Sequence, residues 1–133
     1  MKAVVHVDGG ARGNPGPAAT GVVIESPDGA VLYAGGETIG VATNNVAEYR
    51  ALLAGLEHAR ELGVTDLEVL GDSALVVNQV NGTWRIKEPH LRPLREEAVR
   101  ALAGFDRWKL RHVPRAKNAD ADALVNQALD AAA

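Results

Sequence analysis

The stretch VVHVDGGARGNPGP, from Val4 to Pro17, begins like a buried strand and ends in glycines and prolines. The valines leave no clear solvent face, so residues 2–8 are expected to form an interior strand, followed by a loop over residues 9–17. Asp8 would then stand at the carboxyl end of this strand, where a lone charge needs compensation. An aspartate that caps its own glycine turn would explain Asp8 equally well.

Length and composition indicate a single globular domain and exclude several kinds of site. A chain of 133 residues suits one domain with a sizeable core, and a single monomeric domain over residues 1–133 is expected. The absence of cysteine excludes disulfides, thiolate zinc sites and cysteine nucleophiles, and favours a cytoplasmic location. No apolar run approaches the ~20 residues of a membrane helix, so no membrane association is expected.

Charge is distributed unevenly along the chain. Residues 84–117 carry ten basic and four acidic residues, whereas residues 1–83 carry four basic and ten acidic residues. A positive surface beside a negative pocket suits a polyanion held near metal-binding carboxylates. Two ordinary solvated surfaces would give the same pattern.

Hydrophobic periodicity and turn signals predict five strands and four helices. The expected strands are residues 2–8, 20–25, 30–37, 67–70 and 107–113, and the expected helices are residues 46–62, 73–80, 90–102 and 118–132. A leading antiparallel meander followed by alternating helices and strands indicates an α/β fold with a mixed sheet and helices on its faces.

Two further carboxylates stand where such folds collect ligands. Glu48 lies on the apolar side of helix 46–62, in its expected first turn, where a favourable helix dipole or an inward-facing ligand would account for it. Asp72 follows a strand in DLEVLGDS, at the carboxyl end of that strand. Capping of the next helix by Asp72 or Ser73 is the competing interpretation.

The last helix offers Asp120 and Asp122, which flank its apolar stripe at similar angles, so periodicity does not choose between them. Three or four carboxylates in one pocket would repel one another unless cations neutralised them. Oxygen ligands without cysteine favour Mg²⁺ or Mn²⁺. A pair of such ions ~3.5–4 Å apart is the usual arrangement for phosphodiester cleavage.

Four blocks of the chain resemble, in order, the motifs of type 1 ribonuclease H: DGGARGNPGPAATGVVI, TNNVAEYRALLAGLE, GDSALVVNQVNG and HVPRAKNADADALVNQAL. The resemblance covers nearly the whole chain and implies the ribonuclease H-like fold, with a five-stranded mixed sheet in the order 3-2-1-4-5. It also implies an endonuclease that uses two Mg²⁺ ions to hydrolyse the RNA strand of RNA–DNA hybrids. The implied products carry 5′-phosphate and 3′-hydroxyl ends.

The resemblance also implies roles for particular residues. The catalytic and metal-binding carboxylates would be Asp8, Glu48, Asp72 and Asp122, because Asn118 followed by Asp122 fits the family's last block and Asp120 does not. Asp8 would bridge both ions, Asp122 would help to hold the ion that activates water, and Glu48 and Asp72 would hold the leaving-group ion. The implied substrate-binding residues are Gly9, Gly10, Asn14, Thr43, Asn44, Asn45, Trp84 and Arg115.

The chain departs from many relatives in two places. The segment NGTWRIKEPHLRPLREEA is compact where they carry a basic, tryptophan-rich protrusion, so Trp84 is expected either as a reduced DNA-strand contact or as a packed aromatic. Arg115 stands where many relatives have a mobile histidine, while His112 is expected to remain on the preceding strand. Arg115 would act through its charge, because arginine does not give up its proton.

The residues leave three other functions open. These are a hybrid-binding module without catalysis, a related DNA resolvase or exonuclease, and a small metal-dependent phosphatase. The GNPGP and TNN blocks favour the hybrid-cleaving branch.

Overall fold

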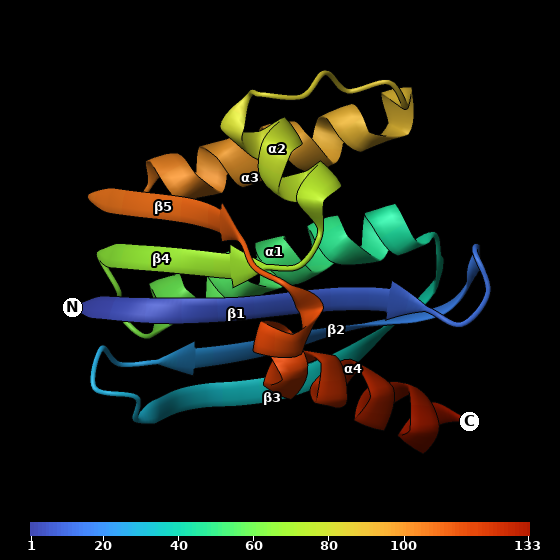
Figure 1. The fold of residues 1–133 in the computed structure, drawn as a ribbon, viewed down its shortest axis with the longest axis horizontal. Helices are drawn as coiled ribbons and strands as arrows, with labels where there is room; N and C mark the ends of the chain where they lie inside the picture. The colour runs from blue at the N-terminus through green and yellow to red at the C-terminus, as the bar shows by residue number, and fades with distance from the viewer.

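The computed structural model describes all 133 residues and contains one five-stranded sheet in the order β3-β2-β1-β4-β5 (Figure 1). Its strands are β1 (Lys2–Ala11), β2 (Gly16–Glu25), β3 (Val31–Ala42), β4 (Asp66–Gly71) and β5 (Arg107–His112). The first three strands are antiparallel, whereas β4 and β5 run parallel to β1. The expected mixed sheet and strand order are confirmed.

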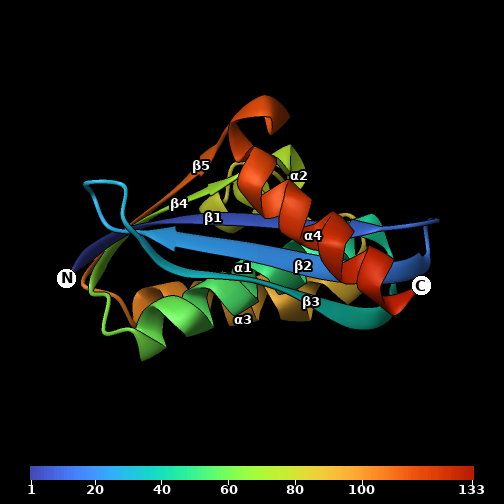
Figure 2. The same ribbon diagram turned by 90° about the horizontal axis from the view of Figure 1, so that it is seen from below.

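Helices cover both faces of this sheet (Figure 2). They are α1 (Asn44–Glu61), α2 (Ala74–Asn81), α3 (Arg92–Ala103) and α4 (Ala119–Ala132), with the short 3₁₀ turns η1 (Pro89–Leu91) and η2 (Arg115–Asn118). Helix α1 packs on β1 and β2 and against α3, while α4 lies across β2 and β3 on the other face. None of these helices combines the length and apolarity needed to span a bilayer.

The main core lies between the sheet and α1. Val5 of β1, Val69 of β4 and Leu52 of α1 are almost completely buried there, together with Tyr49. Residues of β1 alternate, so Val5 and Val7 are buried under α1 while His6 is only partly buried. Asp8 therefore belongs to the face that α4 covers.

The loop predicted for residues 9–17 is wrong over most of its length. β1 continues to Ala11 and β2 begins at Gly16, because Gly9, Gly10 and Ala11 remain paired with β2 after β4 has ended. β3 likewise runs five residues beyond the predicted end at Glu37. Glycine-rich sequence usually indicates a loop, but here the antiparallel partner β2 keeps these residues in the sheet.

The predicted start of helix 46–62 is also too late. Thr43 is the N-cap, and its Oγ1 accepts a hydrogen bond from the Val46 N–H at 3.2 Å, so α1 begins at Asn44. Glu48 consequently lies in the second turn and not in the first. The helix dipole, which acts within the first turn, does not account for its position.

Two glycines allow α4 to approach the sheet closely. Gly21 of β2 pairs with Asp8 on one side and with Gly36 of β3 on the other. A Cβ atom at Gly21 would collide with the carbonyl oxygen of Ala121, and one at Gly36 would collide with that of Leu124. The backbone of α4 thus rests directly on the strand beside Asp8.

We expect Gly21→Ala to lower the free energy of unfolding by about 1–3 kcal/mol, because the new methyl group must push α4 away from the sheet. The matched control is Gly10→Ala, where the new Cβ would meet only Val125 Cγ1 at an ordinary 3.7 Å. Urea denaturation of both variants measures the difference. Equal stability of the two variants would contradict the close packing of α4.

Candidate active site

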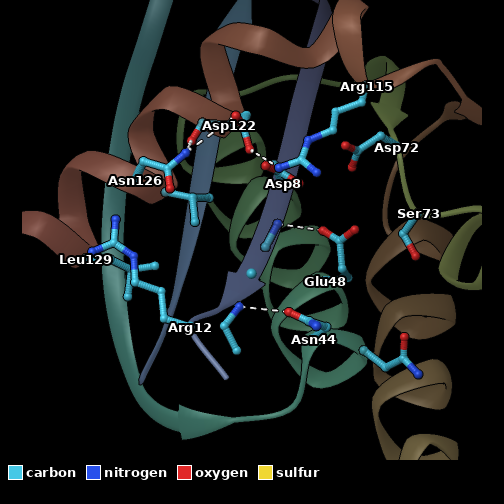
Figure 3. Close-up of a pocket in the computed structure, with 15 residues that line it drawn as sticks. Asp8, Arg12, Asn44, Glu48, Asp72, Ser73, Arg115, Asp122, Asn126 and Leu129 are labelled. Atoms are coloured by element: carbon cyan, nitrogen blue, oxygen red, sulfur yellow. Dashed lines mark hydrogen bonds and ion pairs between the residues drawn. The ribbon is translucent and has the colours of Figure 1, made fainter. Parts of the chain in front are cut away.

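The site opens where β4 ends. The last residue pair between β1 and β4 joins Val7 to Gly71, so the edge of β1 is uncovered from Asp8 onward. Asp72 follows β4 directly, and both aspartates therefore stand at the carboxyl end of the parallel strands. Figure 3 shows them facing one cavity.

Glu48 reaches the same cavity from α1. Its Oε1 accepts a hydrogen bond from the Gly9 N–H at 2.6 Å, which ties the helix to the residue after Asp8. A Cβ at Gly9 would collide with the carbonyl of Ala47, so glycine is what permits this approach. Asp8, Glu48 and Asp72 each place a carboxylate oxygen within 4.8 Å of the others.

Asp122 enters from α4. Its Oδ1 accepts a hydrogen bond from Arg115 Nη2 at 3.2 Å, and Asn126 Nδ2 lies 3.5 Å from its Oδ2 (Figure 3). Asp120, two residues earlier, is exposed and lines a different hollow beside His6. The fold therefore brings Asp122, and not Asp120, to the cavity of the other carboxylates.

A buried amide sets the start of α4 relative to β1. Asn118 is 2% exposed, and its Nδ2 donates to the carbonyl oxygen of Val7 at 2.8 Å. This hydrogen bond joins the residue before α4 to the residue before Asp8. It supports the placement of Asp122 near Asp8.

The carboxylates raise one another's affinity for protons. Asp8 is only 5% exposed, and its burial, together with the charges of Glu48 and Asp72, raises its pKa to about 9. Burial and the charge of Asp72 raise the pKa of Glu48 to about 7, although the Gly9 N–H opposes this shift. The protein therefore disfavours the ionised forms of these two carboxyls, and a bound cation would favour them.

The donor set fits hard divalent cations. Asp72 Oδ1 is buried and has no hydrogen-bond partner in the protein. An unpartnered buried carboxylate oxygen, next to two carboxyls with raised pKa values, fits a ligand set for a cation. Arg115 supplies one positive charge at the rim, and its contact with Asp122 raises the pKa of its guanidinium.

The cavity has a volume of about 400 Å³ and includes five of the eight residues that the sequence suggested for substrate binding. These are Gly9, Gly10, Asn44, Asn45 and Arg115. Asn14 does not line the cavity, but its Oδ1 accepts a hydrogen bond at 3.0 Å from the N–H of Asn44, which does. Thr43 caps α1.

Trp84 lies elsewhere. It is 50% exposed, so the alternative of a packed aromatic is wrong. With Arg85, and with Arg92 and Arg95 of α3, it lines a separate hollow of about 320 Å³ formed by α2, α3 and the segment that joins them. His112 is the last residue of β5, as expected, and its Nε2 lies 3.3 Å from the carbonyl oxygen of Asp72.

Sequence reasoning missed three polar residues of the cavity, namely Arg12, Ser73 and Asn126. The sequence suggests Ser73 only as a helix cap, and Ser73 Oγ does cap α2 by accepting a hydrogen bond from the Val76 N–H at 3.2 Å. Asn126 lies one helical turn after Asp122, a spacing that would have placed both on one face. Arg12 carried no comparable signal because it follows β1 in a turn.

Comparison with known proteins agrees with this geometry. The family model described as reverse transcriptase-like matches residues 6–128. The chain is 54% identical over 125 residues to ribonuclease HI of Halobacterium salinarum. The aligned residues make up 94% of this chain but only 63% of that relative, so this chain spans less than two thirds of the relative's length.

Solved structures give the same result. The crystal structure of RNase H1 from Halobacterium salinarum superposes with a TM-score of 0.96 at 52% identity, covering 98% of this chain and 99% of the other. LC11-RNase H1 in complex with an RNA/DNA hybrid superposes with a TM-score of 0.92 at 41% identity, covering 98% of both chains. With the sheet order and the convergent carboxylates, these similarities show that the chain belongs to the type 1 ribonuclease H family.

Proposed function

We propose that this chain is an endonuclease that hydrolyses the RNA strand of RNA–DNA hybrids and leaves 5′-phosphate and 3′-hydroxyl ends. The observation that carries the proposal is the convergence of Asp8, Glu48 and Asp72 within 4.8 Å, with raised pKa values at the first two. The names of the similar proteins support it, and one of them was crystallised with an RNA/DNA hybrid.

We further propose that Asp8, Glu48, Asp72 and Asp122 hold two Mg²⁺ ions, with Mn²⁺ as a substitute. Four carboxylates balance the charge of two divalent ions, and hard oxygen ligands favour these metals. Such ions, when bound, activate water for attack on phosphorus and stabilise the leaving oxygen.

The residues around the carboxylates suit recognition of RNA. Gly9 and Gly10 expose backbone, and Asn44 and Asn45 offer amide groups in the same cavity. A protein distinguishes RNA from DNA through contacts to the 2′-hydroxyl, which both donates and accepts hydrogen bonds. These residues, with Asn14 and Thr43 behind them, are our candidates for the surface that reads the RNA strand.

Arg115 would act through its positive charge. Its guanidinium contacts Asp122 in the free protein, and it stays protonated, so it orients this carboxylate or a phosphate and does not transfer protons.

Trp84 and Arg85 lie outside the cavity, where they would meet only a longer stretch of the DNA strand. We also propose that residues 1–133 act as one monomeric domain in the cytoplasm. The lack of cysteine supports the cytoplasmic location.

The proposal is tested by incubating labelled RNA–DNA hybrid, duplex DNA and duplex RNA with the protein in Mg²⁺ or in EDTA. We expect efficient cleavage of the hybrid's RNA strand alone, and none in EDTA. Cleavage that persists when all RNA 2′-hydroxyls are replaced would favour a DNA nuclease instead.

A matched pair of variants on α4 separates catalytic from surface carboxylates. Asp122→Asn should lower kcat at least ~100-fold, because it weakens a metal ligand, whereas Asp120→Asn should stay within about twofold of the wild-type rate. Circular dichroism would verify that both variants are folded. Wild-type kcat in Asp122→Asn would remove this residue from the catalytic set.

Stability of the metal-free protein should fall as pH rises. The pKa of Asp8 is about 9 in the folded chain and 3.8 as its reference value, so between these values the folded state holds a proton that the unfolded state has released. Raising the pH from 6 to 8.5 in EDTA should therefore lower the free energy of unfolding by on the order of 1–3 kcal/mol.

Urea denaturation measures this effect, with Asp8→Asn as the comparison, since it removes the titrating carboxyl and most of the pH dependence. Millimolar Mg²⁺ should restore stability at pH 8.5 in the wild type, because an ion that binds only the folded state stabilises it. A wild-type stability that rises with pH in EDTA would contradict the predicted protonation of the cluster.

A further inference from the structure

Arg12, which lines the active-site cavity, forms an ion pair with Asp130 of α4. Its Nη2 lies 2.6 Å from Asp130 Oδ1 in the last turn of α4, and both side chains remain well exposed, at 46% and 69%. Arg12 also lines the cavity that contains Asp8 (Figure 3). Arg12 and Arg115 are the two arginines among the lining residues.

The backbone that carries Arg12 is held firmly. The Arg12 N–H donates to the carbonyl of Pro17 at 2.8 Å, and the preceding Ala11 N–H donates to Asn44 Oδ1 at 2.9 Å. Asn44 in turn donates its N–H to Asn14 Oδ1. The turn is therefore fixed to the start of α1, while the long arginine side chain is free to exchange its partner.

Asp130 contributes little to the stability of α4. An acidic residue at the carboxyl end of a helix faces the negative end of the helix dipole. An exposed ion pair is worth only ~0–1 kcal/mol. Helix α4 is already anchored by Val125 and Leu129, which are buried against β2, and by Asn118.

The position of Arg12 suits a substrate phosphate. It directly follows the end of β1, four residues after Asp8, and at ~3.3 Å per residue of strand its backbone is roughly 13 Å from that of Asp8. Phosphates of a nucleic-acid strand recur every ~3.4 Å along the helix axis, so a backbone that crosses the cleavage site passes Arg12 within a few nucleotides. Arginine binds phosphate through two parallel N–H donors.

We propose that Arg12 binds a backbone phosphate of the nucleic acid a few nucleotides from the cleaved bond, and that Asp130 occupies this arginine until the substrate displaces it. The inference rests on the proposed hybrid-cleaving function. Asp130 then competes with the substrate for Arg12: it holds the guanidinium beside the cavity but weakens substrate binding. The two members of the ion pair should therefore affect substrate affinity in opposite directions.

The test is steady-state cleavage of RNA–DNA hybrid by the wild type, Arg12→Ala, Arg12→Lys, Asp130→Asn and the double variant Arg12→Ala/Asp130→Asn, over a range of salt concentrations. Arg12→Ala should raise KM roughly 5–10-fold with little change in kcat, and should reduce the slope of log(kcat/KM) against log[salt] by about 1. Arg12→Lys should recover part of the affinity. Asp130→Asn should lower KM roughly two- to fivefold.

The double variant should match Arg12→Ala, since Asp130 acts only through Arg12. The control is Arg60→Ala, an exposed arginine about 24 Å of helix away from Asn44, which should leave KM and the salt slope unchanged. An ion pair that only braces α4 would lower the melting temperature in both single variants and would not move KM in opposite directions.

That outcome, or a KM that rises in both single variants or changes in neither, overturns the phosphate contact while leaving hybrid cleavage by the wild type intact. Absence of hybrid cleavage by the wild type would instead overturn the proposed function, and the inference with it.

Discussion

The constraint around which this site is organised is the mutual repulsion of three carboxylates, of which Asp8 is buried and Glu48 and Asp72 are half-buried. Asp8, Glu48 and Asp72 come from β1, α1 and the end of β4, and their oxygens lie within 4.8 Å of one another. Repulsion alone would push these elements apart. Glycine at position 9, which lets α1 approach β1, and the hydrogen bond from its N–H to Glu48 oppose that separation. Bound protons or bound metal ions would reduce the repulsion among the three carboxylates.

Close packing of α4 on the sheet brings a fourth carboxylate to the same cavity. Gly21 and Gly36 remove the Cβ atoms that would hold the helix away, and Asn118 ties its start to the carbonyl of Val7. Asp122 then faces the cavity, while Arg115 and Arg12 place positive charge at its rim. The cavity is thus acidic where ions would bind and basic at the edge, where a polyanion would meet it.

Local pattern predicted the central strand and the inward face of Glu48, because both follow from periodicity within one element. The strand order came from the family resemblance and agrees with the structure. Periodicity could not choose between Asp120 and Asp122, since both flank the apolar stripe. The family resemblance selected Asp122, and the packing of α4 on β2 places it in the cavity while Asp120 lines another hollow. The ion pair of Arg12 could not be predicted from local pattern, because its partner, Asp130, is 118 positions away in the chain.

The central claim is that these carboxylates form one divalent-metal site, and anomalous scattering from crystals of the protein soaked in Mn²⁺ tests it most directly. The account predicts anomalous density among Asp8, Glu48 and Asp72, with Asp72 Oδ1 as one of the ligands. Crystals in which Mn²⁺ binds only at other surface carboxylates, or not at all, would contradict it.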